Sequence, residues 1–207
     1  YKRQLPDEAP PIMAVNVGKR GFLTTVEPDE VGEAIKAFWT GRARVEERMR
    51  LEAEIRGRMR TPKALNEVCL TCRTPVKLFK AEVRRDGILA CSVEGDGVIV
   101  ATPAGSTAYS LSCGGPIVDP GLRCLLVTPI CPMGFSRPLV LPPDVEVGVR
   151  VLRAREPVLV VDGQAVFELR PGDEVVVRAS AKPLRFVGLT DRFYEKLAGR
   201  GMRPHGR

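Results

Sequence analysis

The stretch from Glu94 to Pro116 combines small hydroxyl residues with glycines, and it is the part of the chain best suited to ligand chemistry. Val98–Ala101 is a short apolar run that predicts a strand buried on both faces. Glycines flank this run, and glycine lets the backbone turn sharply and lets another molecule come close. The hydroxyl groups around it suit a polyhydroxylated ligand such as a nucleotide; they belong to Thr102, Ser106, Thr107, Tyr109, Ser110 and Ser112. The alternative interpretation is a Ser- and Gly-rich surface loop.

Three shorter motifs also carry side chains that could contact a ligand. Asn66-Glu67 lies between apolar residues; an asparagine offers a base edge both donor and acceptor, and a carboxylate can accept from two ribose hydroxyls. The alternative is a loop-to-strand junction. Asp96, between two glycines, is poorly placed for core packing. Asp162-Gly163-Gln164 follows an apolar run and in most proteins is simply a turn.

The six cysteines do not predict a metal site. Cys69-x-x-Cys72 could be half of a zinc site, but no second such pair exists and the one histidine, His205, lies in the tail. In the absence of a secretory signal, we expect reduced thiols in a cytoplasmic protein. Cysteines acting as small apolar residues are the simpler interpretation.

Composition favours an anionic small-molecule partner. The chain has 207 residues, a net charge of +7 and an estimated isoelectric point near 9.3, a balance that attracts phosphorylated ligands or nucleic acid. Aromatic residues make up only 5%, which weakens the case for base stacking on single strands, so no nucleic acid partner is expected. A basic β-domain that binds nucleic acid stays the weaker alternative. No apolar run is long enough to span a bilayer, and no membrane partner is expected.

A helix is predicted over Pro28–Thr40. Its apolar residues recur at helical spacing, so one stripe should face a core, and Gly41 suits the position after the helix. That stripe consists of Val31, Ala34, Ile35 and Phe38, with Trp39 as a packing residue beside it.

Most of the remaining chain predicts short strands. Residues 49–55 alternate between apolar and charged, which is typical of a half-buried strand. Asp86-Gly87 marks a hairpin turn, and further strands recur at roughly ten-residue spacing, as in an all-β sandwich. A short helix with Asp191 as its N-cap and Phe193 and Leu197 on one side should end the chain, with fraying from Gly199 onward.

The stretch from Gly95 to Pro116 closely resembles the signature of NAD kinases, and Thr107–Ser112 matches it letter for letter. The resemblance extends from about Met13 to Leu197 and includes the Asn-Val-Gly segment after Ala14, the Asn66-Glu67 pair, Thr128–Val140 and Asp162-Gly163-Gln164. A match of this length favours a ligand site over a surface loop.

The resemblance and the strand pattern together predict a mixed α+β fold. Residues 1–46 would be the C-terminal part, or remnant, of an N-terminal α/β nucleotide-binding domain. Residues 47–188 would form a mainly antiparallel, sandwich-like NAD-binding domain. Residues 189–207 would be a short C-terminal helix and a frayed tail, packing back on the α/β domain.

The resemblance also implies the ligand contacts. Asn66 and Glu67 would bind the adenosine part of NAD, and Asp96 its nicotinamide end. Lys77 is either a ligand contact or a surface lysine, and Leu111 has plain packing as its alternative. The complete set of implied NAD-binding residues is Asn66, Glu67, Lys77, Asp96, Thr107, Ala108, Tyr109, Ser110, Leu111, Ser112 and Gln164.

The sequence departs from the family pattern at three places. Glu94 stands where the family usually has a basic residue. Either another basic residue compensates for it, or this position does not contact the ligand. Met133 replaces a histidine, and near it Cys131 is more simply structural than ligand-binding. No Gly-Gly-Asp-Gly loop occurs in the 207 residues, so the catalytic base is expected upstream of residue 1 and no catalytic residue within them.

The function implied is ATP-dependent phosphorylation of the adenosine 2′-hydroxyl of NAD to give NADP. ATP would act with Mg²⁺ or another divalent cation, and the protein would be a homodimer or homotetramer. The alternative is a non-catalytic nucleotide-binding or regulatory module that has lost the catalytic loop.

Overall fold

The structure is a computed structural model, and it describes residues 9–18, 22–74, 77–134, 136–190 and 192–201. Among these, one compact unit comprises residues 49–182, and a second comprises residues 9–48 and 183–201. None of the helices in the described ranges is long and apolar enough to cross a membrane. The expected N-cap Asp191 and the tail residue His205 lie outside the described residues.

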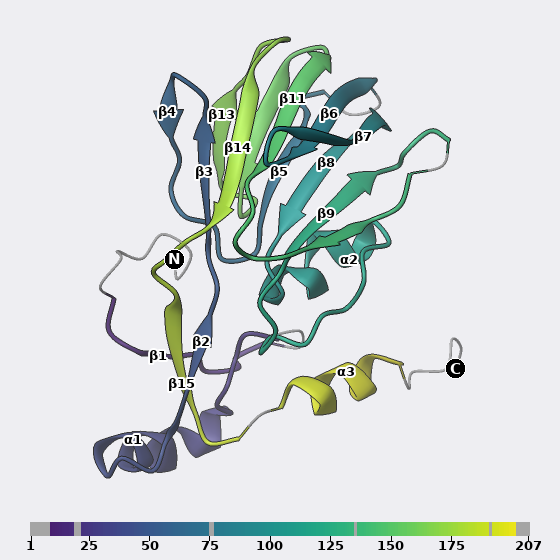
Figure 1. Cartoon of the computed structure of the whole chain (residues 1–207). Coiled ribbons are helices and arrows are strands. Elements are labelled where there is room, and N and C mark those ends of the chain that lie inside the picture. Colours follow the sequence, from purple (N-terminus) through teal and green to yellow (C-terminus); the bar gives the residue numbers. More distant parts are fainter. Residues whose placement is uncertain (1–8, 19–21, 75–76, 135, 191, 202–207) are drawn as a thin grey trace. The chain divides into compact units, whose positions relative to one another are not determined.

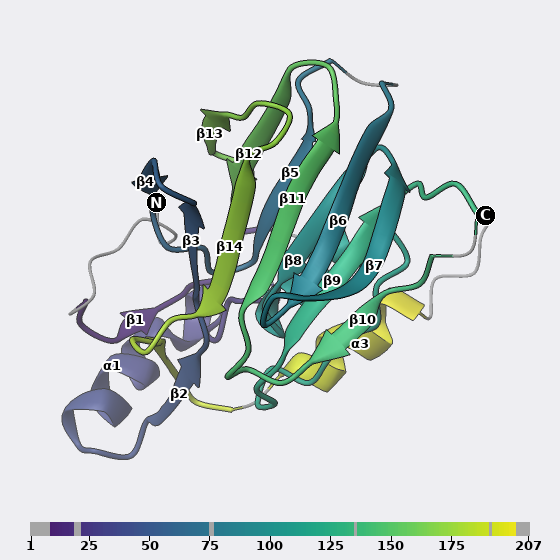
Figure 2. The ribbon, with the colours of Figure 1, turned by 45° about the horizontal axis from the view of Figure 1, so that its top comes forward.

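The larger unit is a sandwich of two six-stranded sheets (Figures 1 and 2), as the strand spacing predicts. Every pair of neighbouring strands in both sheets is antiparallel. In spatial order, the first sheet consists of β4 (Met59–Arg60), β3 (Leu51–Ile55), β14 (Glu174–Ala179), β11 (Val147–Arg153), β6 (Phe79–Arg85) and β7 (Ile88–Gly95). In the same way, the second sheet consists of β10 (Leu139–Leu141), β9 (Leu125–Ile130), β8 (Gly97–Ala101), β5 (Glu67–Cys72), β12 (Pro157–Val161) and β13 (Ala165–Glu168).

The two sheets differ in how their faces are covered. In β3 the apolar residues are buried and alternate with more exposed charged ones, because only one face of the first sheet meets the core. Strands β8 and β9 are buried at every position, which confirms the prediction for Val98–Ala101. Their second face packs in a separate apolar cluster with Val118 and Cys124 from the following loop. Arg50 breaks the alternation: it is fully buried, and its Nε donates to the carbonyl of Lys182 (3.0 Å).

The hairpin predicted at Asp86-Gly87 joins β6 to β7. Both residues have positive φ, +50° and +80° respectively, as in the turns whose twist matches the twist of two paired strands. This turn is confirmed at the residue level because its chemistry is local.

The smaller unit contains a three-stranded sheet of β1 (Ile12–Met13), β15 (Leu184–Gly188) and β2 (Arg44–Arg48), in that spatial order. Strand β15 pairs in parallel with β1 and antiparallel with β2. The strand spacing assigns residues 184–188 to the all-β domain, whereas β15 pairs with β1 and β2. The alternation within a short strand does not indicate which sheet the strand will join.

Helix α1 (Val31–Trp39) follows one short 3₁₀ turn, η2 (Pro28–Glu30), and ends before Gly41, whose φ is +69°. The buried residues of α1 are Ala34 and Ala37. The predicted stripe is therefore wrong in part, since Ile35 and Phe38 are 45% and 40% exposed and Trp39 is 80% exposed. The face that turns inward is lined by small residues, which periodicity of large apolar side chains does not reveal.

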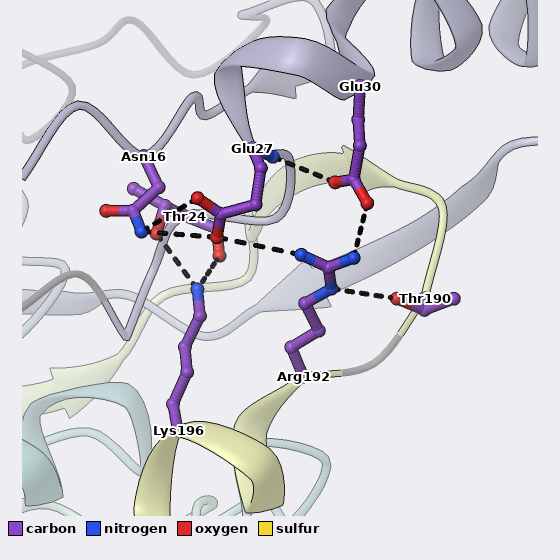
Figure 3. A network of polar contacts seen from close by, with 7 residues as sticks. All are labelled: Asn16, Thr24, Glu27, Glu30, Thr190, Arg192 and Lys196. Carbon is purple, nitrogen blue, oxygen red and sulfur yellow. Dashed lines mark hydrogen bonds and ion pairs between the residues drawn. The ribbon is translucent and has the colours of Figure 1, made fainter. Parts of the chain in front are cut away.

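Helix α3 (Phe193–Gly201) is bonded to the chain before α1 by the polar network in Figure 3. Arg192, just before the helix, contacts both Glu27 (3.6 Å) and Glu30. Lys196 donates to the hydroxyl of Thr24 (3.0 Å) and to its carbonyl, and its partial burial lowers its pKa. The helix continues to Gly201, and the rest of the tail for which fraying is expected, residues 202–207, lies outside the described residues.

Candidate functional site

Asn66 and Glu67 lie where the chain enters β5, and both are nearly buried, at 5% and 7% exposure. Their backbone is fixed on one side by Asp162, which has φ +50° in the turn between β12 and β13. The Oδ1 of Asp162 accepts from the N–H groups of Asn66 (2.8 Å) and Glu67 (3.0 Å), and its Oδ2 accepts from that of Leu65 (2.8 Å). Asp162 is 2% exposed, and both of its carboxylate oxygens accept from the backbone that carries the pair.

The other side of the same segment is held by Thr102, directly after β8. The fully buried Thr102 hydroxyl donates to the carbonyl of Leu65 (2.7 Å) and accepts from the N–H of Gly105 (3.0 Å). The Thr102 N–H donates to the carbonyl of Asn66 (2.9 Å). Gly105 itself lies so close that an added Cβ would be 2.0 Å from the Asn66 oxygen.

Three segments far apart in the sequence therefore converge at one end of the second sheet. They are Leu65–Glu67 before and in β5, Thr102–Gly105 after β8, and the turn at Asp162 after β12. In that turn the N–H of Gln164 donates to the carbonyl of Val161 (3.0 Å) and the Gln164 side chain is exposed. Adjacent antiparallel strands bring these ends together, and the predicted contacts Asn66, Glu67 and Gln164 share this edge.

The signature residues Thr107–Ser112 follow in two short helical turns, η3 (Ala104–Thr107) and α2 (Tyr109–Ser112). Much of the hydroxyl row is used internally. The hydroxyls of Ser110 and Thr128 bond to each other (2.8 Å), and Ser106 bonds with Val118 (3.1 Å from its N–H). Both serines are fully buried. The row is therefore largely structural, a role that its composition did not indicate.

The more accessible part of the signature is Tyr109 and its neighbours. Tyr109 is 45% exposed and Ser112 is exposed, whereas Thr107, Ala108 and Leu111 are half-buried. Partial burial of the Tyr109 phenol, together with the nearby Cys113 thiol, raises its pKa to about 12. The phenol therefore stays protonated at neutral pH and can act as a hydrogen-bond donor.

Asp96 lies at the opposite end of β8 from Thr102. The strand has five residues, so the two positions are roughly 20 Å apart at ~3.3 Å per residue. Asp96 is half-buried, its N–H donates to the Ile130 carbonyl (2.9 Å), and its carbonyl accepts from the Thr71 hydroxyl (2.7 Å). Within the described part of the chain, no hydrogen bond or ion pair engages its carboxylate.

The glycines around Asp96 are required by the chain itself. An added Cβ would be 2.6 Å from the Ile130 oxygen at Gly95 and 2.3 Å from the Leu70 oxygen at Gly97. Close approach of neighbouring backbone therefore explains these two glycines.

Lys77 and Glu94 are placed at the Asp96 end. Lys77 is exposed and comes two residues before Phe79, which pairs with Gly95. Glu94 is directly opposite Lys80 in the ladder, and Lys80 Nζ is 3.3 Å from a Glu94 carboxylate oxygen. The acid that departs from the family pattern thus has a basic partner beside it.

The six cysteines, all within described residues, are free. Burial of the Cys69 thiol, and to a smaller extent the negative charge of the nearby Glu67, raise the pKa of Cys69 to about 12. Cys131, in contrast, is exposed to solvent. Since the thiolate is the reactive form, we expect iodoacetamide at pH 8 to label Cys131 rapidly and Cys69 only after unfolding. Peptide mass spectrometry of native and denatured samples would measure this, and rapid native labelling of Cys69 would contradict it.

Two domain families match this chain. The ATP-NAD kinase C-terminal domain matches residues 65–189, and the ATP-NAD kinase N-terminal domain matches residues 1–43. An NAD kinase of Methanothermobacter thermautotrophicus is 41% identical over 195 residues, covering 93% of this chain and 68% of that relative.

Two solved structures resemble the fold closely. A crystal structure of a yeast NADH kinase complexed with NADH has a TM-score of 0.87 and 31% identity, covering 97% of this chain and 61% of that one. An NAD kinase from Archaeoglobus fulgidus in complex with ATP has a TM-score of 0.82 and 32% identity, covering 94% of this chain and 75% of that one.

Proposed function

This chain belongs to the NAD kinase family, and on that basis we propose that its protein transfers a phosphoryl group from ATP to the adenosine 2′-hydroxyl of NAD, giving NADP. The observation that carries the proposal is the convergence of Asn66, Glu67 and Gln164 at one sheet edge. Phosphoryl transfer depends mostly on positioning and charge neutralisation. The residues assigned here bind NAD, and no catalytic base is assigned among them.

The geometry supports a two-ended NAD site. The adenosine would contact Asn66 and Glu67 at one end of β8, and the nicotinamide end would lie toward Asp96 at the other. The exposed part of Thr107–Ser112, with the protonated Tyr109 phenol as a donor, would border the ligand. Lys77 and Lys80 supply positive charge near Asp96. We propose Lys80, which forms an ion pair with Glu94, as the basic residue that takes the place of the one that the family has at position 94.

We propose that ATP acts together with Mg²⁺ or another divalent cation. Among the described residues, no group of three or more His, Cys, Asp or Glu side chains could hold a metal ion. Mg²⁺ commonly reaches such reactions on substrate phosphates, with few protein ligands.

We further propose that the protein is a homodimer or homotetramer in which the exposed Tyr109 lies near a neighbouring subunit. From the six free thiols we propose a cytoplasmic location.

The experiment that tests the function is an assay of the complete gene product with NAD and ATP, with NADP detected by an NADP-specific dehydrogenase. NADP formation is expected. If NAD binds but no NADP forms, the protein is the alternative, a non-catalytic nucleotide-binding module. Parallel reactions with NADH and with polyphosphate would identify the preferred acceptor and donor.

Asp96→Ala should weaken NAD binding about tenfold or more and leave ATP binding within about twofold of the parent. The reason is that a hydrogen bond to a charged group contributes about 1.5–3 kcal/mol, and this carboxylate is not engaged elsewhere among the described residues. Calorimetric titration with each nucleotide measures both affinities, with exposed Asp144→Ala as the control. Equal losses for NAD and ATP would refute the assignment.

A further inference from the structure

We propose that Asp162 and Thr102 are positioning residues that set the selectivity of the site for the adenine base of NAD. Neither side chain would touch the base. Each would act through the backbone of Leu65–Glu67, and the inference rests on the proposed function of Asn66 and Glu67.

The Leu65–Glu67 segment is held by hydrogen bonds with both Asp162 and Thr102. Asp162 accepts hydrogen bonds from three consecutive N–H groups, those of Leu65, Asn66 and Glu67. Thr102 bonds to the carbonyl of Leu65 through its hydroxyl and to that of Asn66 through its N–H. These contacts fix successive peptide planes from both sides, and the direction of the side chains follows from the orientation of those planes.

Burial makes this arrangement stiff. Asp162 and Thr102 are 2% and 0% exposed, so water cannot replace a lost bond without an opening of the structure. Gly105 closes the remaining space, since its N–H donates to the Thr102 hydroxyl (3.0 Å) and its Cα lies against the Asn66 carbonyl. Hydrogen-bond networks of this kind hold functional side chains in one geometry.

Recognition of the adenine base depends on the direction in which the Asn66 side chain points. An asparagine amide distinguishes adenine from hypoxanthine only if its donor and acceptor meet the base edge in a fixed order. A misplacement of about 1 Å can cost about 100-fold in rate. A loosened segment should therefore lose discrimination at the adenine end first, while discrimination at the nicotinamide end, which lies toward Asp96, should stay.

Asp162→Asn tests the first contact. Asparagine tolerates positive φ as aspartate does, so the turn is retained, but its NH₂ group must face at least one backbone N–H and cannot accept from it. The expected result is a fall of about tenfold or more in the preference for NAD over nicotinamide hypoxanthine dinucleotide, measured as the ratio of kcat/KM values. The preference for NAD over NADH, altered only at the nicotinamide, should stay within about twofold.

The chain offers a matched control in Asp86→Asn. Asp86 also has φ +50° before a glycine of positive φ, and its Oδ1 also accepts from a backbone N–H, that of Glu146 (2.9 Å), but it is exposed in the β6–β7 turn. This variant should keep the parental preference.

Thr102→Val and Thr102→Ser provide a second test that does not depend on whether Asp162→Asn folds. Valine removes the hydroxyl and should lower the adenine preference, and serine retains it and should restore the preference. An unchanged ratio in folded Asp162→Asn and Thr102→Val would overturn the inference, as would equal losses at both ends of NAD. A parent protein that neither binds nor phosphorylates NAD would instead refute the proposed function.

Discussion

Replacing Asn66 and Glu67 together by alanine should reduce NADP formation by about 100-fold or more while leaving the fold in place. Each side chain is proposed to make a hydrogen bond to the adenosine of NAD, and loss of such bonds costs about 1.5–3 kcal/mol where a charge is involved and about 1 kcal/mol otherwise. Together they approach 3 kcal/mol, or about two factors of ten in kcat/KM. The measurement is kcat/KM for NAD at saturating ATP.

The control for this variant must separate binding from stability, because both residues are nearly buried. Circular dichroism and ATP affinity should therefore match the parent. Glu67→Gln, which keeps the shape of the side chain, should show a smaller loss in the same direction, and exposed Glu168→Ala should show none. Activity of the double variant within twofold of the parent would contradict the assigned role.

Gly105→Ala should both destabilise the protein and remove NAD binding. The new Cβ would be 2.0 Å from the carbonyl oxygen and 2.6 Å from the carbonyl carbon of Asn66. Both are backbone atoms held by Thr102 and Asp162, so they cannot turn away as a flexible side chain would. Overpacking of this kind costs typically about 1–3 kcal/mol, and a cost of about 2 kcal/mol would lower the melting temperature by about 4–8 °C.

Gly32→Ala is the matched comparison. Nothing lies within 4 Å of a Cβ added at Gly32, which is exposed in α1, and alanine is about 1 kcal/mol more favourable than glycine in a helix. This variant should melt at or above the parental temperature. Calorimetry and NAD titration of both variants measure the effects, and a Gly105→Ala protein with parental stability and affinity would show that the close approach is not a constraint.

The sequence predicted best where the determining interactions are local. The Asp86-Gly87 turn follows from residues that tolerate positive φ, and the sandwich follows from alternation that is interrupted at β8 and β9, where both faces are buried. Strand β15 shows the limit, because its pairing with β1 and β2 depends on residues far away in the chain.

The roles of individual polar residues were harder to predict. Ser106 and Ser110 look like ligand donors in a row of hydroxyls, yet their bonds go to Val118 and Thr128. Asp162 looks like an ordinary turn residue, yet its carboxylate holds the backbone of a segment that lies 95 to 97 residues earlier in the chain. In both cases the partner is remote in sequence, and composition carries no information about it.

The buried face of α1 was also difficult to predict, because it is formed by alanines. The large apolar residues suggested a stripe through Ile35 and Phe38, but the helix packs through Ala34 and Ala37. Small residues allow close approach of a helix to its neighbour, and a pattern based on large apolar side chains overlooks them.

A crystal structure of the protein with NAD bound would show which residues contact each end of the ligand. We expect the adenosine within hydrogen-bonding distance of the Asn66 and Glu67 side chains and the nicotinamide toward Asp96, with Asp162 still bonded to the Leu65–Glu67 backbone. NAD bound with the opposite orientation, or bound away from the edge where β5, β8 and β12 meet, would contradict this expectation.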